Sequence, residues 1–142
     1  MTNKNAVENK ISAVRRYLDM LERYKKFSRE DLEVEDNDDV RAALERRLYL
    51  AIQATIDLAD AVIAVKGFRK PTSYREFFYI LREKDIISGE LAEKMAAMAG
   101  FRNLIAHDYE EIDYGRVYAI LQNDLKDIEI FLERIKDIQG LL

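Results

Sequence analysis

The stretch VRAALERRLYLAIQATIDLADAVIAVKG, residues 40–67, decides the fold. Its apolar residues recur every three or four positions, which is the period of one face of an α-helix. They are Val40, Leu44, Leu48, Ile52, Ile56, Ala59 and Ile63. We therefore predict a long helix over about residues 38–66, with Asn37 or Asp38 as its N-cap and Gly67 as its stop.

Helical spacing also occurs on both sides of this stretch. We expect helices over about residues 5–28 and 114–138, and the acidic stretch Asp31–Asp39 separates the first from the long helix. Ser73 and Glu76 have the spacing of a capping box that opens a short helix, with Tyr74, Phe77, Phe78 and Leu81 on one side of it. Ser88 is expected to cap one more helix, and a loop is expected around residues 107–113. The sequence predicts an all-α protein: an antiparallel, up-and-down four-helix bundle with an additional short helix, forming a single domain over residues 1–142.

Composition excludes several classes of protein. The chain has 142 residues, 49% of them apolar and 35% charged, which suits one globular domain. It has no cysteine, so disulfides, thiolate catalysis and zinc–thiolate sites are excluded. The first ten residues, MTNKNAVENK, lack the apolar segment of a signal peptide, and we found no apolar run near the roughly 20 residues of a membrane helix. We therefore expect a cytoplasmic protein that does not enter a membrane.

The net charge of −4 is unevenly distributed. Residues 1–30 and residues 41–84 each carry a net charge of +4, whereas residues 31–40 carry six acids and no base. Residues 85–142 carry a net charge of −6. The two basic segments can supply a basic face for nucleic acid, although solvated helix surfaces explain the same distribution.

Several chemistries lack their residues. The chain has no glycine-rich phosphate loop, so a nucleotide-binding α/β domain is excluded. Its one histidine, His107, rules out the paired Glu-x-x-His elements of a di-iron bundle. We predict no metal site and no cofactor, and any acid–base chemistry by imidazole must use His107.

Arg102, His107 and Tyr109 form the one segment with chemical character. At about 100° per residue, Arg102 and Tyr109 would share a helix face and His107 would lie about 140° away. An unbroken helix therefore cannot bring the three side chains together. We predict that the helix ends near residues 105–107 and presents the segment at a helix–loop junction.

These residue types suit metal-independent RNA cleavage. Histidine can take the proton of an attacking 2′-hydroxyl or supply one to the leaving oxygen, and a guanidinium can stabilise the charge of the phosphorane. Because the reaction needs an acid and a base, a single histidine suggests a homodimer with two copies of the segment in one cleft. Two alternatives stay open: Arg102 pairs with Glu110 or Glu111, or His107 only caps a helix C-terminus.

The segment resembles the R-x4–6-H-x-Y motif of HEPN-domain ribonucleases. The run Gly100–Asp113 is similar to the HepT branch of that family in particular. Three upstream stretches look similar to that branch as well: Ala43–Leu48, Ile56–Ala59 and Pro71–Tyr74. The resemblance covers about residues 8–136.

The resemblance implies a HEPN-like helical bundle that acts as the toxin of a type VII toxin–antitoxin system. Such a toxin is a homodimeric, metal-independent endoribonuclease, and its antitoxin, an MntA-like nucleotidyltransferase, adds AMP to the motif tyrosine. It implies that Arg102 and His107 are catalytic and that Tyr109 is the AMPylated residue and a substrate contact. Asn103 and Asp108 are candidates for supporting roles. The alternative is a non-catalytic helical module that binds a nucleotidyltransferase subunit.

Overall fold

The computed structural model describes residues 3–34, 38–107 and 112–142, and almost all of this part of the chain is helical. The α-helices are α1 (Asn3–Glu22), α2 (Arg29–Glu33), α3 (Asp38–Lys66), α4 (Tyr74–Glu83), α5 (Gly89–His107), α6 (Tyr114–Ala119) and α7 (Leu125–Ile138). A π-helical turn, Ile120–Asp124, joins α6 to α7, and 3-10 turns follow α1 (Arg23–Lys26) and α7 (Gln139–Leu141). The described residues include no strand.

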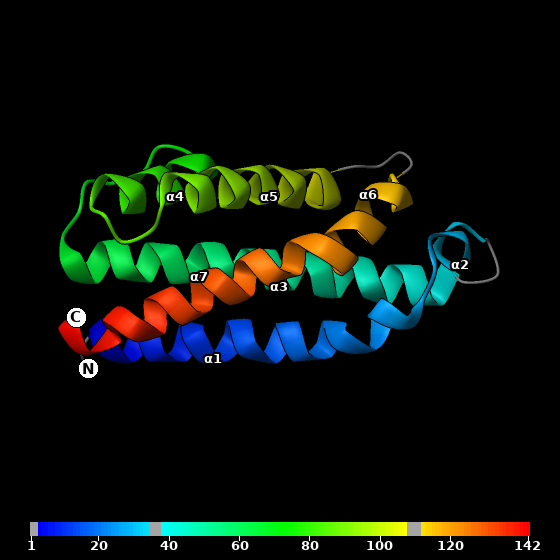
Figure 1. The fold of residues 1–142 in the computed structure, drawn as a ribbon, viewed down its shortest axis with the longest axis horizontal. Helices are drawn as coiled ribbons and strands as arrows, with labels where there is room; N and C mark the ends of the chain where they lie inside the picture. The colour runs from blue at the N-terminus through cyan, green and yellow to red at the C-terminus, as the bar shows by residue number, and fades with distance from the viewer. Residues whose placement is uncertain (1–2, 35–37, 108–111) are drawn as a thin grey trace.

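The long helices form an antiparallel bundle (Figure 1). α1, α3, α5 and the α6–α7 unit run in alternating directions, and the shorter α4 lies along α5. This confirms the predicted all-α, up-and-down bundle. Two short helices accompany the four long elements rather than one, because α2 was not predicted.

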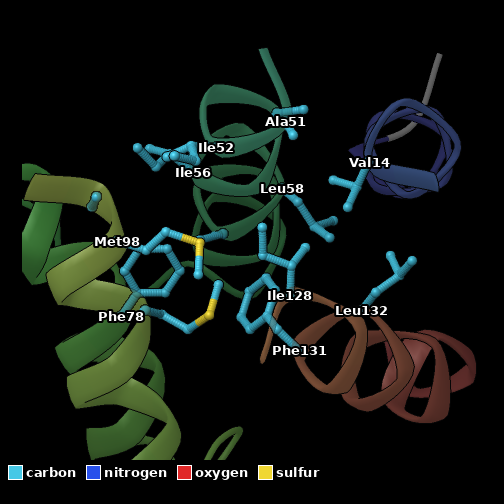
Figure 2. Packing of buried hydrophobic residues seen from close by; sticks show 14 of the residues in the cluster. Val14, Ala51, Ile52, Ile56, Leu58, Phe78, Met98, Ile128, Phe131 and Leu132 are labelled. Atoms are coloured by element: carbon cyan, nitrogen blue, oxygen red, sulfur yellow. The ribbon is translucent and has the colours of Figure 1, made fainter. Parts of the chain in front are cut away.

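Helix α3 contributes eleven buried residues, more than any other described helix. Figure 2 shows its side chains meeting those of α1, α4, α5 and α7 in the core between the helices. The rings of Phe78 on α4 and Phe131 on α7 pack edge to face, with centroids 5.6 Å apart. Burying a side chain of this size stabilises a fold by about 1.5–3 kcal/mol, so the packing of this core holds the bundle together.

The extensive burial of α3 explains its unusual hydrophobicity. Among the described helices it is the one long and apolar enough to cross a membrane, with a mean hydropathy of 1.7 over an 18-residue window. This window contradicts the expectation that no apolar run approaches the length of a membrane helix. More than half of it, 56%, is buried inside the bundle, as in the core helix of a soluble protein.

Helix ends follow the local capping signals with some corrections. The 38–66 prediction is confirmed, and Gly67 ends α3 with a φ of +68°. Asp38, however, is the first residue of α3 and not its N-cap, and Asn37 lies outside the described residues. Ser88 Oγ accepts from the Leu91 N–H at 3.1 Å, which confirms that cap.

Three other predicted elements need correction. The first helix stops at Glu22 because Ser28 opens α2 through a capping box with Asp31. The last predicted helix is divided by the π-helical turn. Ser73 caps α4 by accepting from the Glu76 N–H at 3.3 Å, but the Glu76 carboxylate accepts from Thr72 rather than from the Ser73 backbone. The predicted box is therefore half formed.

Candidate functional site

The motif segment lies at the C-terminal end of α5. The helix continues through Arg102 and Asn103 and is described as far as His107, so the predicted break near residues 105–107 stays a prediction. The structure describes His107 by its backbone alone. Asp108 and Tyr109 lie outside the described residues, as do Glu110 and Glu111, the predicted alternative partners of Arg102.

The half-buried Arg102 side chain is held by hydrogen bonds to three neutral side chains. Its Nε donates to Gln53 Oε1 at 2.7 Å, and one terminal nitrogen donates to the Tyr49 hydroxyl at 3.0 Å. The other terminal nitrogen donates to Asn103 Oδ1 at 2.9 Å. These bonds fix the orientation of the planar guanidinium, and they give the predicted residue Asn103 a contact that supports Arg102.

Two tyrosine rings contact the same guanidinium. Its carbon lies 5.0 Å from the centroid of Tyr49 and 4.8 Å from the centroid of Tyr74. A cation within about 6 Å of an aromatic face is attracted by the ring quadrupole. Arg102, Tyr49, Gln53 and Tyr74 therefore form one unit, which we call the arginine clamp.

No carboxylate of the described residues pairs with Arg102 itself, although the Asp57 carboxylate accepts a hydrogen bond from Gln53 Nε2 of the clamp at 2.8 Å. Among the described residues, no Asp or Glu oxygen lies within 4.0 Å of an Arg102 nitrogen. Because a charge taken out of water needs a counter-charge or strong polar contacts, a half-buried arginine with neutral partners is suited to receive an anion. A phosphate group matches the planar fork of guanidinium donors.

Helix α3 supplies half of the clamp through its spacing. Tyr49 and Gln53 are four residues apart, so they share one face of the helix, and that face is turned towards α5. Arg46 lies on the same face and its guanidinium carbon is 5.6 Å from the Tyr49 ring. Sequence reasoning missed Tyr49 and Gln53. The available signal was the spacing of four residues, which places Tyr49 and Gln53 on one face of the helix.

Sequence reasoning also missed one contact of Tyr74. It was expected on one side of its helix together with Phe77, and the two rings are stacked there, but its contact with Arg102 was not predicted; Tyr74 is 37% exposed and its ring lies against Arg102. Tyr74 is the first residue of α4, immediately after the Ser73 cap. The Ser73 cap therefore fixes the position of Tyr74 at the start of α4, where its ring faces α5.

A second tyrosine contact fixes the chain just beyond the motif. Tyr114 begins α6, and its hydroxyl donates to Glu45 of α3 at 2.9 Å. Burial, reinforced by this hydrogen bond, raises the pKa of Tyr114 to about 12. The Asp113 carboxylate caps α6 by accepting from the Gly115 N–H at 2.9 Å. The described chain thus resumes after the motif with a capped helix that is anchored to α3.

The sequence matches the profile of one protein family over most of its length. The family is described as Ribonuclease HepT-like, and the match covers residues 14–135. A tRNA nuclease HepT from Aphanizomenon flos-aquae is 29% identical over 95% of this chain and 92% of that protein. An mRNA nuclease HepT from Shewanella oneidensis is 32% identical over 63% of this chain and 67% of that protein.

The fold matches that of a solved toxin. The protein is a tri-AMPylated HEPN toxin from Shewanella oneidensis in complex with an MNT antitoxin. The TM-score is 0.81 and the identity 24%, and the match covers 92% of this chain and 96% of that chain. At this identity the likeness concerns the fold.

Proposed function

The chain belongs to the Ribonuclease HepT-like family, and from this premise we propose that it is a toxin that cleaves RNA without a metal ion, at Arg102 and His107. The observation that carries the proposal is the arginine clamp. It holds a guanidinium free of carboxylates among the described residues, on the helix that contains His107. RNA supplies the phosphate that such a cation lacks.

The proposed reaction is an attack of the ribose 2′-hydroxyl on the adjacent phosphorus. His107 accepts or donates the proton, because imidazole titrates near neutral pH. Arg102 stabilises the negative charge of the phosphorane, and its fixed orientation means that little reorganisation is needed as this charge develops. The bond to the 5′-oxygen then breaks and leaves a 2′,3′-cyclic phosphate and a 5′-hydroxyl.

A homodimer would complete this site. The chain has one histidine, and the reaction uses an acid and a base. A two-fold pair of chains would bring a second His107 and a second Arg102 to one cleft. We therefore propose the dimer as the active form, with Asp108 as a residue that supports the histidine.

We further propose that a nucleotidyltransferase antitoxin silences the toxin by adding AMP to Tyr109. The family resemblance supports this, and the solved toxin of the same fold carries AMP groups in its complex with an antitoxin. An AMP phosphate two residues from His107 would compete with RNA for the guanidinium of Arg102.

One experiment tests the nuclease proposal. Wild type and the His107→Ala variant are expressed alone in bacteria, and purified samples are incubated with RNA in EDTA. We expect growth arrest and cleavage with the wild type alone, with products that end in a 2′,3′-cyclic phosphate. Equal growth and intact RNA with both proteins would instead favour the alternative, a non-catalytic helical module that binds a nucleotidyltransferase subunit.

A second experiment tests Tyr109. The chain is incubated with a nucleotidyltransferase antitoxin of the family and ATP, and the peptides are analysed by mass spectrometry. We expect the mass of AMP on Tyr109 and a loss of cleavage. Modification at another residue, or full cleavage by the modified protein, would refute this assignment.

A further inference from the structure

A second concentration of positive charge lies on the other side of α3, in a surface groove between α1, α3 and α7. The groove has a volume of about 760 Å³. Half of its lining residues are basic: Arg15, Arg16, Arg23, Arg47 and Lys136. Asp19 is the one acidic residue of the lining. The groove is thus strongly positive in a chain whose net charge is −4.

The acid in the groove is already neutralised. Asp19 pairs with Arg15 at 3.2 Å, and Arg15 is also bound by Glu129 of α7 at 2.7 Å. Arg16, Arg23 and Arg47 have no carboxylate within 4.0 Å among the described residues. The positive charges of three groove arginines are therefore not neutralised by a carboxylate of the described residues.

Tyrosine contacts hold these three arginines, as they hold Arg102. The guanidinium carbons of Arg23 and Arg47 lie 5.1 and 5.6 Å from the Tyr24 ring, and that of Arg16 lies 5.0 Å from the Tyr17 ring. Such contacts orient a cation without cancelling its charge.

The spacing of the exposed arginines suits a polymer of phosphates. Arg16 lies on α1 and Arg23 begins the 3-10 turn that follows it; they are seven residues apart along a helical path, which corresponds to a separation of about 10 Å, and both line the groove. Between them the groove exposes apolar surface, including Met20, which is 40% exposed. This groove places cations at intervals along an apolar surface. It therefore fits a single nucleic-acid strand, whose phosphates can contact the cations while its bases contact the apolar surface.

The groove is connected to the arginine clamp through α3. Arg47 lines the groove, and the preceding residue, Arg46, contacts the Tyr49 ring of the clamp. On the helix, Arg46 lies between Arg47 and the face that carries Tyr49 and Gln53. Arg46 also has no carboxylate partner among the described ion pairs. Unneutralised cations therefore continue from the groove, around α3, to Arg102.

We propose that this groove binds the phosphate backbone of the RNA substrate on the side of the bundle away from the cleavage site. The inference rests on the proposed nuclease function and adds a substrate-binding surface to it. Continuity with Arg102 favours RNA over an acidic protein surface, since a protein partner would not require the cations to extend to the clamp. The groove contributes affinity and positioning, and it takes no part in bond breaking.

The test compares two pairs of charge-removing substitutions in the full chain. Arg16→Gln/Arg23→Gln removes the two exposed groove arginines. Lys66→Gln/Lys70→Gln removes the same charge from two exposed lysines at and after the end of α3. Affinity for a fluorescent 2′-O-methyl RNA, which cannot be cleaved, is measured by anisotropy over a range of salt concentrations, and thermal unfolding checks the fold.

We expect the groove pair to weaken RNA binding by ~10-fold and to reduce the slope of log affinity against log salt by about 1.4, because each lost phosphate contact on a single strand contributes about 0.7. The lysine pair should leave both near wild type, and Arg16→Lys/Arg23→Lys should restore most of the affinity. Equal losses of RNA affinity in the two glutamine pairs would overturn the proposal, because the overall charge of the protein would then explain RNA binding. Unchanged RNA affinity with lost binding to a nucleotidyltransferase antitoxin would make the groove a protein interface.

Cleavage assays separate this inference from the proposed function. With cleavable RNA, the groove pair should lower kcat/KM and leave kcat unchanged at saturating RNA. If the wild type bound 2′-O-methyl RNA through the groove but cleaved no RNA, the proposed nuclease function would be refuted and the proposal that the groove binds RNA would stand. A wild type that cleaves, with a groove pair of wild-type affinity, would refute the groove and keep the nuclease.

Discussion

Two arginines hold helices together in this bundle, and their surroundings differ in one respect. Arg15 joins α1 to α7 through a two-pronged pair with Glu129, in which both hydrogen bonds are 2.7 Å long. Arg102 joins α5 to α3 through the neutral side chains of Tyr49 and Gln53. Both guanidinium groups are fixed between helices, but only Arg15 is paired with a carboxylate of the residues that the structure describes.

The protonation equilibria reflect the pairing of Arg15. Its hydrogen bond to Glu129 raises the pKa of Arg15 above its usual range, and the same bond holds the pKa of the Glu129 carboxyl below its usual range. A cation that is this well paired has little capacity left for a further anion. The comparison assigns Arg15 to the fold, and it agrees with our proposal that Arg102 binds the RNA phosphate.

The largest effect should come from removing the charge at Arg102. We expect Arg102→Gln to lower the RNA cleavage rate by ~10²–10³, the typical loss for one preorganised donor in a transition state. The temperature of unfolding should change little, because the partners of Arg102 are neutral and polar. Single-turnover cleavage and thermal unfolding measure the two quantities. If Arg102→Gln were destabilised and still cleaved RNA at the wild-type rate, Arg102 would stabilise the fold, as Arg15 does, and would not act in cleavage.

A smaller effect is expected when the clamp is loosened without loss of charge. Tyr49→Phe keeps the ring beside the guanidinium and removes the hydroxyl that accepts its hydrogen bond. Tyr49 is a positioning residue, so we expect kcat to fall by ~10-fold, about the value of one hydrogen bond to a charged group, with KM nearly unchanged.

The control for Tyr49 is Tyr79→Phe. The Tyr79 hydroxyl contacts the exposed Glu93 at 3.4 Å and is not part of the clamp. Its loss should leave kcat at the wild-type value. Equal kcat values for wild type and Tyr49→Phe would show that the tyrosine does not position Arg102.

The smallest effect should come from Arg15→Gln. We expect the free energy of unfolding to fall by about 1 kcal/mol at neutral pH, since both side chains of the pair are 38% exposed and solvent screens them. The cleavage rate at saturating RNA should be unchanged. Urea unfolding and cleavage assays measure the two effects, and a large loss of kcat would contradict the assignment of Arg15 to the fold.

The contribution of this pair should also depend on pH. The pKa of Glu129 is lowered in the fold, so its stabilisation is complete above the pKa of the unfolded carboxyl, about 4.3, and is lost as the pH falls through the lower folded value. The difference between wild type and Arg15→Gln should therefore be full at pH 7 and shrink from about pH 4 downwards. A difference that persists to pH 2 would have another origin, such as lost packing of the arginine stem.

Local signals in the sequence were sufficient for the bundle. The long apolar repeat predicted α3, and Ser88 predicted the start of α5. Ser28 and Asp31 carried a capping-box signal that was overlooked, so α2 was missed. The π-helical turn left no signal, because the apolar spacing around it is compatible with a regular helix.

The candidate site was only partly predictable. Arg102 and Asn103 could be identified because they belong to a short motif, and the structure brings them into contact. Tyr49 and Gln53 are about 50 residues away in sequence and reach Arg102 only through the packing of α3 on α5. Helical spacing places the two side chains on one face of α3, but which residue that face contacts depends on the tertiary structure.

Because of the π-helical turn at Ile120–Asp124, the contacts of the last helical unit depend more on its number of residues than on which residues form the turn. Such a turn holds one more residue than an α-helical turn, so the segments on its two sides face different directions. The first places Tyr114 against Glu45, and the second places Glu129 against Arg15. A deletion of the exposed Asn123 would rotate one segment by about 100° and break one of these contacts, whereas a substitution there would keep both. Insertions and deletions between Tyr114 and Glu129 should therefore be selected against even where substitutions are freely accepted.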